Sequence, residues 1–234
     1  MCGRYTVAVR RPELEEVFPQ LASLPDDRVF SERFNVSPTQ EVAALSSSGD
    51  GAVVAELMRW GLVPAWAESP DVGVKMINAR AETLTERRSY RGLVKSAAGR
   101  CLVIADGFYE WAPASTETPK QPWRFTVDGG KPFAFAGLCT TWQPAEGPAL
   151  RSLTVITTEP NSIVKPIHDR MPAILADQEL RAAWLDQTLT ANQAVELLGP
   201  LEAGRIEKSR VSRAVGNPRN EGPSLLVDEQ AGLF

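Results

Sequence analysis

Apolar stretches separated by short, turn-rich connectors run through most of the chain. Their length and their β-branched and aromatic content are typical of strands, and the candidates are residues 41–46, 52–60, 101–111, 123–127, 133–139 and 152–158. Connectors such as 46–51 and 128–130 are too short for the helical crossovers that parallel neighbours would require. The pattern therefore predicts a largely antiparallel sheet.

Helical periodicity is limited to short segments. Residues 11–18 begin with proline and acids and then place apolar side chains on one face. Similar patterns predict helices within 83–98, at 177–185 and at 190–198, followed by an irregular or extended tail at 211–227. Because the chain shows no internal repeat and no low-complexity linker, these elements favour one α+β domain over residues 1–234.

The composition, with 43% hydrophobic and 23% charged residues, is that of a chain able to bury a sizeable core. No apolar run resembles a signal peptide or approaches the roughly 18 residues that span a bilayer. We therefore expect a cytoplasmic protein, associated with the nucleoid if the source is bacterial, without membrane contact. Cys101 and Cys139 lie in apolar runs and are predicted to be core residues with free thiols.

The net charge of -4 gives no general attraction for nucleic acid, so such binding would need a local basic patch. Residues 85–100 are the candidate, because they hold five basic side chains against the single acid Glu86. The same stretch could equally be the solvated face of a helix.

Cys2 directly follows the initiator methionine, which is usually removed when the second residue is small. The mature chain would then start with a free α-amine and a thiol on adjacent carbons. An interior cysteine cannot offer this pair of groups.

His168 is the single histidine of the chain. Histidine titrates nearest to neutral pH and is therefore a candidate for acid–base chemistry, although a lone histidine is more often a structural hydrogen-bonding group. Asp169 and Arg170 adjoin it, and nearby prolines keep the segment extended beyond a buried strand. These neighbours favour a site over a structural role.

Glu110 stands among aromatic residues at the end of the apolar stretch 101–111. Burial against aromatic rings favours the neutral carboxyl group, which suits a general acid or base near neutral pH. The alternative is a glutamate on an edge strand with its carboxylate in water, and the local sequence supports both equally.

Two further segments carry candidate binding residues. Asn78, Arg80 and Glu82 alternate along the chain, so an extended segment would turn all three to one face. Such a row binds a polar or anionic ligand, or it is a solvated strand face, which the local pattern favours. Trp60 and Trp66 flank a loop with glycine and proline, and they either stack on nucleobases or close the core.

The three cysteines and His168 together would make up a Cys₃His set of zinc ligands. None of these residues forms the short-spaced pair that zinc sites typically contain. We therefore expect no metal and no cofactor.

Eight segments occur together in an order that resembles one known family. They are "MCGRY" (1–5), "FNVSPTQEV" (34–42), "RWGLVPAW" (59–66), "INARAET" (77–83), "CLVIADGFYEW" (101–111), "ITTEPN" (156–161), "IHDRMP" (167–172) and "VSRAVGN" (211–217). The chain closely resembles the SOS-response-associated peptidase (SRAP) family, whose members crosslink to abasic sites in DNA. The resemblance covers nearly the whole chain, and matches only loosely at 112–122 and 178–210.

The resemblance implies a single-domain α+β fold with a mostly antiparallel, barrel-like core, peripheral helices and a positively charged groove for single-stranded DNA. It implies that an N-terminal cysteine forms a thiazolidine with the aldehyde of an abasic deoxyribose. The implied catalytic residues are Cys2, Asn78, Glu110 and His168, with Thr157 in support. The implied DNA contacts are Arg4, Asn35, Pro38, Trp60, Arg80 and Arg170.

The resulting expectation is a monomeric enzyme that crosslinks to abasic sites in single-stranded DNA. One alternative is an N-terminal-nucleophile thiol peptidase or amidohydrolase, in which the amine of Cys2 is the base. Another is a non-catalytic single-strand-binding module in which Cys2 is incidental.

Overall fold

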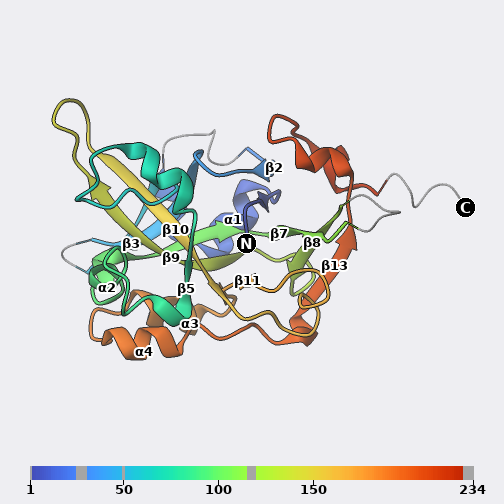
Figure 1. Ribbon diagram of the computed structural model, residues 1–234. Helices are drawn as coiled ribbons and strands as arrows, with labels where there is room; N and C mark the ends of the chain where they lie inside the picture. Colours follow the sequence, from blue (N-terminus) through green and yellow to red (C-terminus); the bar gives the residue numbers. More distant parts are fainter. Residues whose placement is uncertain (1, 25–30, 49–50, 115–119, 229–234) are drawn as a thin grey trace, which may run out of the picture.

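The larger of two sheets closes into a barrel. Its strands follow the order β11-β10-β4-β3-β6-β9-β12, and β10 also pairs with β9, so five strands form a ring (Figure 1). The strands are β3 (Glu41–Ser47), β4 (Val53–Trp60), β5 (Asn78–Arg80), β6 (Arg100–Ala105), β9 (Phe133–Trp142), β10 (Leu150–Thr158), β11 (Met171–Pro172) and β12 (Ile174–Leu175). All pairings in this sheet are antiparallel except those of β10 with β4 and β5.

The smaller sheet is entirely antiparallel and lies beside the barrel. Its order is β13-β8-β7-β1-β2. The strands are β1 (Tyr5–Val7), β2 (Arg33–Val36), β7 (Gly107–Ala112), β8 (Gln121–Val127) and β13 (Ile206–Arg210). This computed structural model describes residues 2–24, 31–48, 51–114 and 120–228.

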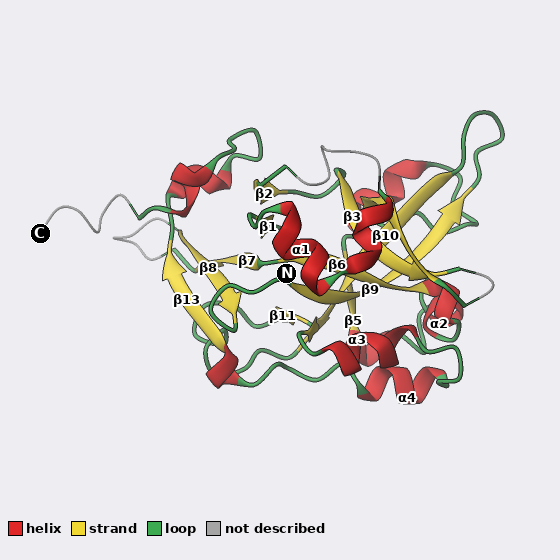
Figure 2. Cartoon of the chain, turned by 180° about the vertical axis from the view of Figure 1, so that it is seen from behind, coloured by secondary structure: helices red, strands yellow, loops and turns green. Residues whose placement is uncertain are grey.

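Helices are short and lie outside the barrel. The α-helices are α1 (Arg11–Val17), α2 (Arg91–Val94), α3 (Gln178–Leu185) and α4 (Ala191–Glu196), and the 3₁₀ segments are η1 (Pro19–Ser23), η3 (Pro70–Lys75), η4 (Ala81–Thr83), η5 (Ala97–Gly99), η6 (Ala203–Arg205), η7 (Arg213–Gly216) and η8 (Pro223–Leu226). Seen from behind, α1 lies in front of β6 (Figure 2), and Leu14 of α1 shares an apolar cluster with Leu102 and Ile104 of that strand. Within the described residues, no helix has the length and apolar character to cross a membrane.

Alternate residues of β6 enter two different apolar clusters. Cys101 and Val103 belong to the cluster that fills the barrel, whereas Leu102 and Ile104 belong to the cluster under the helices. Because both faces of β6 are buried, its sequence is continuously apolar. Cys101 and Cys139 are both fully buried with free thiols, which confirms that they are core residues.

The prediction of a single strand over 101–111 is wrong in one respect. The structure divides it into β6 and β7 at Asp106, where the chain leaves the barrel for the smaller sheet. Asp106 is buried and accepts a hydrogen bond from Arg124 at 3.1 Å. A Cβ at Gly107 would lie 2.8 Å from Nε of Arg124 and 2.9 Å from Oγ1 of Thr6, so only glycine fits this close approach.

The helix expected within part of 83–98 is present but short: Arg91–Val94 forms an α-helix, and the rest of the stretch is turns and 3₁₀ segments. The helices expected at 11–18, 177–185 and 190–198 are present with slightly different ends. The tail at 211–227 is irregular, with two short 3₁₀ segments, as expected. The antiparallel α+β class is confirmed.

Candidate active site

Cys2 lies just before β1, at the junction of the two sheets. The ring of Tyr5 contacts Trp60 of the barrel, with the ring centroids 5.2 Å apart, and Phe135, with the centroids 5.6 Å apart. On its other side β1 pairs with β7, and the N–H of Tyr109 donates to the carbonyl of Arg4 at 2.9 Å. These contacts hold the chain start, and Cys2 has a fully buried side chain.

Asn78 fixes the backbone of Cys2. Its Nδ2 donates to the carbonyl oxygen of Cys2 at 2.7 Å. Strand β5 carries Asn78 and pairs in parallel with the end of β10, so the amide comes from the barrel side of the junction. Oδ1 of Asn78 is buried and has no hydrogen-bond partner among the described residues. This oxygen can therefore accept a hydrogen bond from a bound group.

Glu110 and His168 complete the cluster around Cys2. Oε2 of Glu110, on β7, lies 3.8 Å from Nε2 of His168, which precedes β11. Glu110 is 2% exposed. Burial raises the pKa of the Cys2 thiol, and the Glu110 carboxyl group raises that pKa further once it is ionised. The structure brings together Cys2, Asn78, Glu110 and His168, which are 166 positions apart at their extremes in the sequence (168 − 2).

Residues 169 and 170 hold the ring of His168 through Nδ1. This nitrogen lies 3.0 Å from the backbone nitrogen and 3.1 Å from the carbonyl oxygen of Arg170, and 3.2 Å from Oδ1 of Asp169. The N–H donates to an unprotonated Nδ1 and the two oxygens accept from a protonated one, so these contacts fit either neutral tautomer. Nε2 is the nitrogen that faces Glu110. Burial lowers the pKa of His168 from its ordinary value, which keeps the ring neutral at physiological pH.

Burial has the opposite effect on the carboxyl group of Glu110. Removal from water raises the pKa of Glu110 from its ordinary value of 4.5 to about 8, and the negative charge of Asp169 adds to this shift. At neutral pH the carboxyl group therefore holds a proton that it can donate and take back. A protonated acid beside a neutral imidazole and a buried cysteine is an arrangement suited to proton transfer during nucleophilic addition.

Thr157 lies at the end of β10 and is 1% exposed. Its hydroxyl donates to the carbonyl of Ala79 on β5 at 3.4 Å, and its own carbonyl accepts from Arg170 at 2.6 Å. Thr157 thus belongs to the wall beside Asn78 and holds the strands that carry the site.

Arg4 and Asn35, two of the predicted DNA contacts, belong to one hydrogen-bond network, in which Arg4 is partly exposed. Nη1 of Arg4 donates to Oδ1 of Asn35 and to the carbonyl of Val215, both at 2.7 Å. Nδ2 of Asn35 donates to the carbonyls of Asn217 and Asn220, at 3.0 and 2.8 Å. Asn35 is 1% exposed, so contrary to the prediction its side chain is not available to a base.

Trp60 also departs from its predicted role. Its ring is fully buried against Tyr5, and its Nε1 donates to the carbonyl of Ile77 at 2.9 Å. Trp60 is the last residue of β4 and closes the barrel core, which is the second of the two interpretations that the sequence left open. Trp66 is 51% exposed and lies under the guanidinium of Arg88, 4.7 Å from the ring centroid. Pro38 is partly exposed.

Two hollows meet beside the cluster. One, of about 590 Å³, is lined by Trp66, Asn78 and Arg88 among other residues. The other, of about 730 Å³, is lined by His168 and Lys165 among others. Arg80 and Arg170 line both, so the two hollows adjoin at these arginines.

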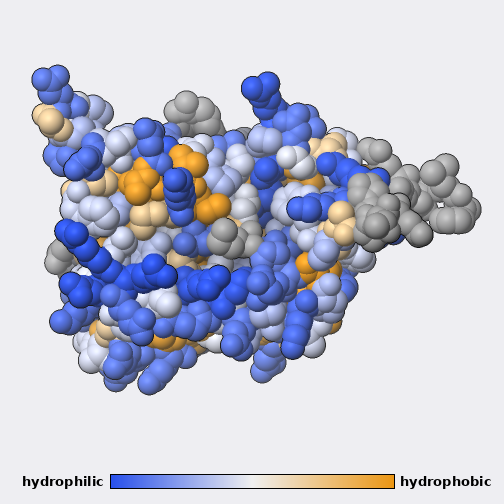
Figure 3. All heavy atoms as spheres, viewed as in Figure 1, coloured by the Kyte–Doolittle hydropathy of each residue, from blue (hydrophilic) through white to orange (hydrophobic). Residues whose placement is uncertain are grey.

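The surface around the hollows is mainly hydrophilic. Figure 3 shows a belt of hydrophilic residues that runs across this face over β5, with apolar residues above it over η3. Arg80 is exposed, and it lines the first hollow together with Arg87 and Arg88. The basic stretch 85–100 had two interpretations from sequence, and the structure places two of its arginines in the hollow next to Asn78.

Comparison with known proteins identifies the family. The family model "SOS response associated peptidase (SRAP)" matches residues 1–218. The chain is a member of the SRAP family. This SRAP protein is 39% identical over 227 residues to the "Abasic site processing protein YoqW" of Bacillus subtilis, a match that covers 97% of this chain and 99% of the relative.

Relatives from vertebrates and solved structures extend the comparison. The "Abasic site processing protein HMCES" of Xenopus tropicalis is 33% identical to this SRAP protein, over 86% of this chain and 68% of the relative. A crystal structure of a protein from Bacteroides thetaiotaomicron has the same fold, with a TM-score of 0.82 and 24% identity over 96% of this chain and 98% of that chain.

Proposed function

We propose that this SRAP protein processes abasic sites in single-stranded DNA by forming a covalent thiazolidine through Cys2, after Met1 is removed. The observation that carries the proposal is the convergence of Asn78, Glu110 and His168 on the backbone and side chain of Cys2. The relatives named as abasic site processing proteins support the substrate.

The first step supplies the aldehyde. An abasic deoxyribose is mostly a closed hemiacetal, and protonation of its ring oxygen speeds opening to the aldehyde. Glu110 is protonated at neutral pH because its pKa is about 8, and Nε2 of His168 lies 3.8 Å from its Oε2. Glu110 can give its proton to the ring oxygen, and the resulting carboxylate takes the proton that the C1 hydroxyl group releases.

The second step forms an imine. The α-amine of Cys2 has a reference pKa of about 7.7–8.0, so part of it is neutral at pH 7 and attacks the aldehyde carbon. The carbinolamine then loses its hydroxyl group as water, with a proton from Glu110, whose carboxylate takes back the proton that nitrogen releases. Oδ1 of Asn78 is placed to accept a hydrogen bond from the amine or from a sugar hydroxyl.

The third step closes the ring. The thiol of Cys2 adds to the imine carbon, its proton moves to nitrogen, and a five-membered thiazolidine results. The thiol is already attached to the reacting amine through two carbons, so this step loses no translational freedom. The high pKa of the buried thiol keeps it protonated until this point, which favours attack by the amine first.

Single-stranded DNA fits the surface better than a duplex. The first hollow combines the exposed ring of Trp66 with Arg80, Arg87 and Arg88, which is the combination of stacking face and positive charge that binds unpaired nucleotides. Such a surface has little sequence preference. Arg80, exposed where the hollows adjoin, is the strongest candidate for a phosphate contact beside the lesion.

Replacement of cysteines one at a time tests the proposal. The wild-type protein should give an adduct that survives denaturation with an oligonucleotide containing one abasic site, and Cys2→Ala should give none. Cys101→Ala is the matched control, because its thiol is buried inside the barrel, and this variant should crosslink like wild type. An adduct with Cys2→Ala, or no adduct with wild type whose N-terminus is confirmed as Cys2, would refute the proposal.

A thiol peptidase is the second candidate, favoured by the family description and by the proton-transfer groups beside Cys2. In that reaction the thiol attacks an amide carbonyl and the amine serves as base. The high pKa of the Cys2 thiol opposes this role, since a buried neutral thiol is a weak nucleophile. Turnover of peptides at a rate similar to crosslinking would favour the peptidase.

A further inference from the structure

Glu82 and Arg170 form a fork-to-fork ion pair next to the site. Nη1 of Arg170 donates to Oε1 of Glu82 at 2.8 Å, and Nη2 donates to Oε2 at 2.9 Å. The Arg170 side chain is only 13% exposed, and the hydrogen bonds from this arginine hold the pKa of Glu82 below its ordinary value. A bidentate pair of this kind fixes the plane of the guanidinium as well as its position.

The pair joins three segments that carry functional residues. Glu82 lies in η4, two positions after Arg80 and four after Asn78. Nη2 of Arg170 also donates to the carbonyl of Thr157 at the end of β10. The guanidinium therefore ties the segment that follows Asn78, the end of β10 and the loop that contains His168.

The backbone of Arg170 acts directly on the imidazole. The nitrogen of its N–H group and its carbonyl oxygen lie 3.0 and 3.1 Å from Nδ1 of His168, and Nε2 of the same ring faces Glu110. The direction of this N–H depends on the conformation of residues 168–170, which the side chain of Arg170 anchors through Glu82 and Thr157.

We propose that Glu82 is a positioning residue for the crosslinking reaction: through Arg170 it holds His168 in the orientation that turns Nε2 toward Glu110. The inference rests on the proposed function, because His168 matters only if proton transfer at this site is part of the reaction. Glu82 itself does not touch the reacting atoms.

The competing interpretation is that Glu82 only occupies Arg170 until a DNA phosphate displaces it. The geometry favours positioning, because Arg170 is mostly buried and also bound to a backbone carbonyl that a phosphate would not replace. Arg80 is exposed beside it and is available to a phosphate without breaking any hydrogen bond of this pair.

Single-turnover crosslinking over a range of oligonucleotide concentrations separates the two interpretations, because it gives a maximal rate and a half-saturating concentration. Glu82→Gln keeps the size of the side chain but places an amide N–H₂ against the guanidinium, so the two parallel hydrogen bonds can no longer both form. We expect the maximal rate of this variant to fall roughly tenfold or more, because small displacements of a catalytic group have effects of that size. The half-saturating oligonucleotide concentration should change little. Arg170→Lys should act similarly, and the double variant should lose little more than either single variant.

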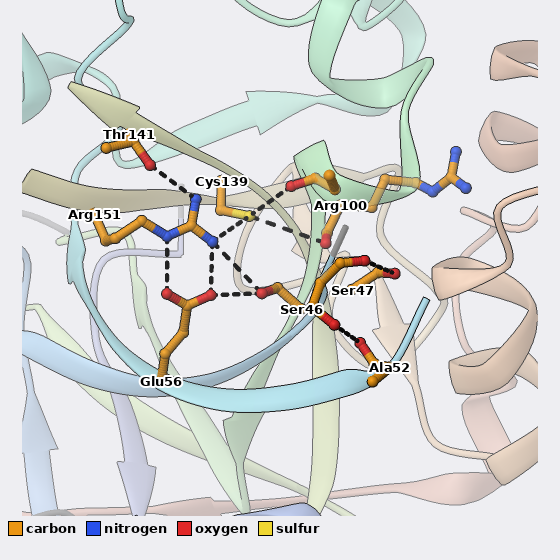
Figure 4. A network of polar contacts seen from close by, with 10 residues as sticks. Ser46, Ser47, Ala52, Glu56, Arg100, Cys139, Thr141 and Arg151 are labelled. Atoms are coloured by element: carbon orange, nitrogen blue, oxygen red, sulfur yellow. Dashed lines mark hydrogen bonds and ion pairs between the residues drawn. The ribbon is translucent and has the colours of Figure 1, made fainter. Parts of the chain in front are cut away.

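A second bidentate pair supplies the matched control. Arg151 donates to Glu56 at 2.8 and 2.6 Å, in the network with Ser46 and Cys139 that Figure 4 shows. Arg151 and Thr157 stand near opposite ends of β10, which separates this pair from the site by roughly 20 Å. Glu56→Gln loses an equivalent ion pair, and we expect its maximal rate to match wild type.

Each outcome of this experiment decides one point. An unchanged maximal rate for Glu82→Gln, or a lower half-saturating concentration at unchanged rate, would overturn the positioning role, and the second result would assign the competing one. Equal losses of maximal rate in Glu82→Gln and Glu56→Gln would also overturn the positioning role, because they would reflect general destabilisation of the protein. Failure of the wild-type protein to crosslink would instead refute the proposed function.

Discussion

Glu110 differs from a surface glutamate because its carboxyl group is almost completely removed from water. The sequence placed this residue among aromatic side chains and supported a buried acid and an exposed carboxylate equally. The structure decides for burial: Glu110 is 2% exposed, and its pKa is raised to about 8. The residue that the proposed mechanism uses as a proton shuttle is therefore also one that costs stability when it ionises.

The stability of the protein should consequently depend on pH through Glu110. Between pH 4.5 and about 8 the unfolded chain has lost this proton while the folded protein keeps it, so stability falls as pH rises through this window. Glu110→Gln removes the titration. The free energy of unfolding of the variant relative to wild type should rise by up to about 1.4 kcal/mol per pH unit in this range.

Urea unfolding at pH 5 and pH 8 measures this difference, with the exposed Glu159→Gln as control. The control should show no such trend. If the difference between Glu110→Gln and wild type is the same at both pH values, the carboxyl group is not buried in its neutral form.

At the scale of elements, the division of 101–111 into β6 and β7 places Glu110. The chain passes from barrel to smaller sheet at Asp106, whose carboxylate is bound by Arg124, and Arg124 also donates to Oγ1 of Thr6 at 3.1 and 3.2 Å. Thr6 is in β1, which begins shortly after Cys2. The three side chains thus join the strand that follows Cys2 to the strand that carries Glu110.

Asp106→Ala should therefore be strongly destabilising. Loss of the carboxylate leaves the mostly buried Arg124 without its ion-pair partner, and breaking a buried pair in this way typically costs about 3–5 kcal/mol. Chemical denaturation measures the loss. A change below about 1 kcal/mol would mean that the pair does not hold the junction.

The sequence predicted most elements whose apolar pattern is regular, and missed those that depend on distant contacts. The barrel strands and α3 were predicted from their own residues. The split at Asp106 was not, because it depends on Arg124 from another strand. Trp60 and Trp66 had the same two interpretations, and contacts of Trp60 with the distant residues Tyr5 and Ile77 accompany the burial of its ring, whereas Trp66 is exposed.

At the scale of the whole molecule, the site lies where the barrel meets the smaller sheet. Of the described residues, four arginines and no acidic residue line the hollow beside Asn78, although the chain carries a net charge of -4. Resemblance to the family supplied the set Cys2, Asn78, Glu110 and His168, which local patterns could only suggest one residue at a time. The structure brings these four together, but turns Asn35 and Trp60 inward.

Binding of undamaged single-stranded DNA should accordingly depend on few phosphates. If Arg80, Arg87 and Arg88 each neutralise one phosphate, the logarithm of the affinity should fall with the logarithm of salt concentration with a slope of roughly -2. Fluorescence anisotropy at several salt concentrations measures the slope, and Arg80→Ala should make it shallower by about 0.7. A slope near zero would exclude binding by this basic surface.

The chemistry at Cys2 is tested most directly by the intact mass of the crosslinked product, before and after treatment with borohydride. The account predicts the mass of the protein without Met1 plus that of the abasic oligonucleotide minus one water, unchanged by borohydride, because a thiazolidine has no C=N bond to reduce. An adduct that retains Met1, or one that gains two hydrogens on reduction as a simple imine does, would contradict it.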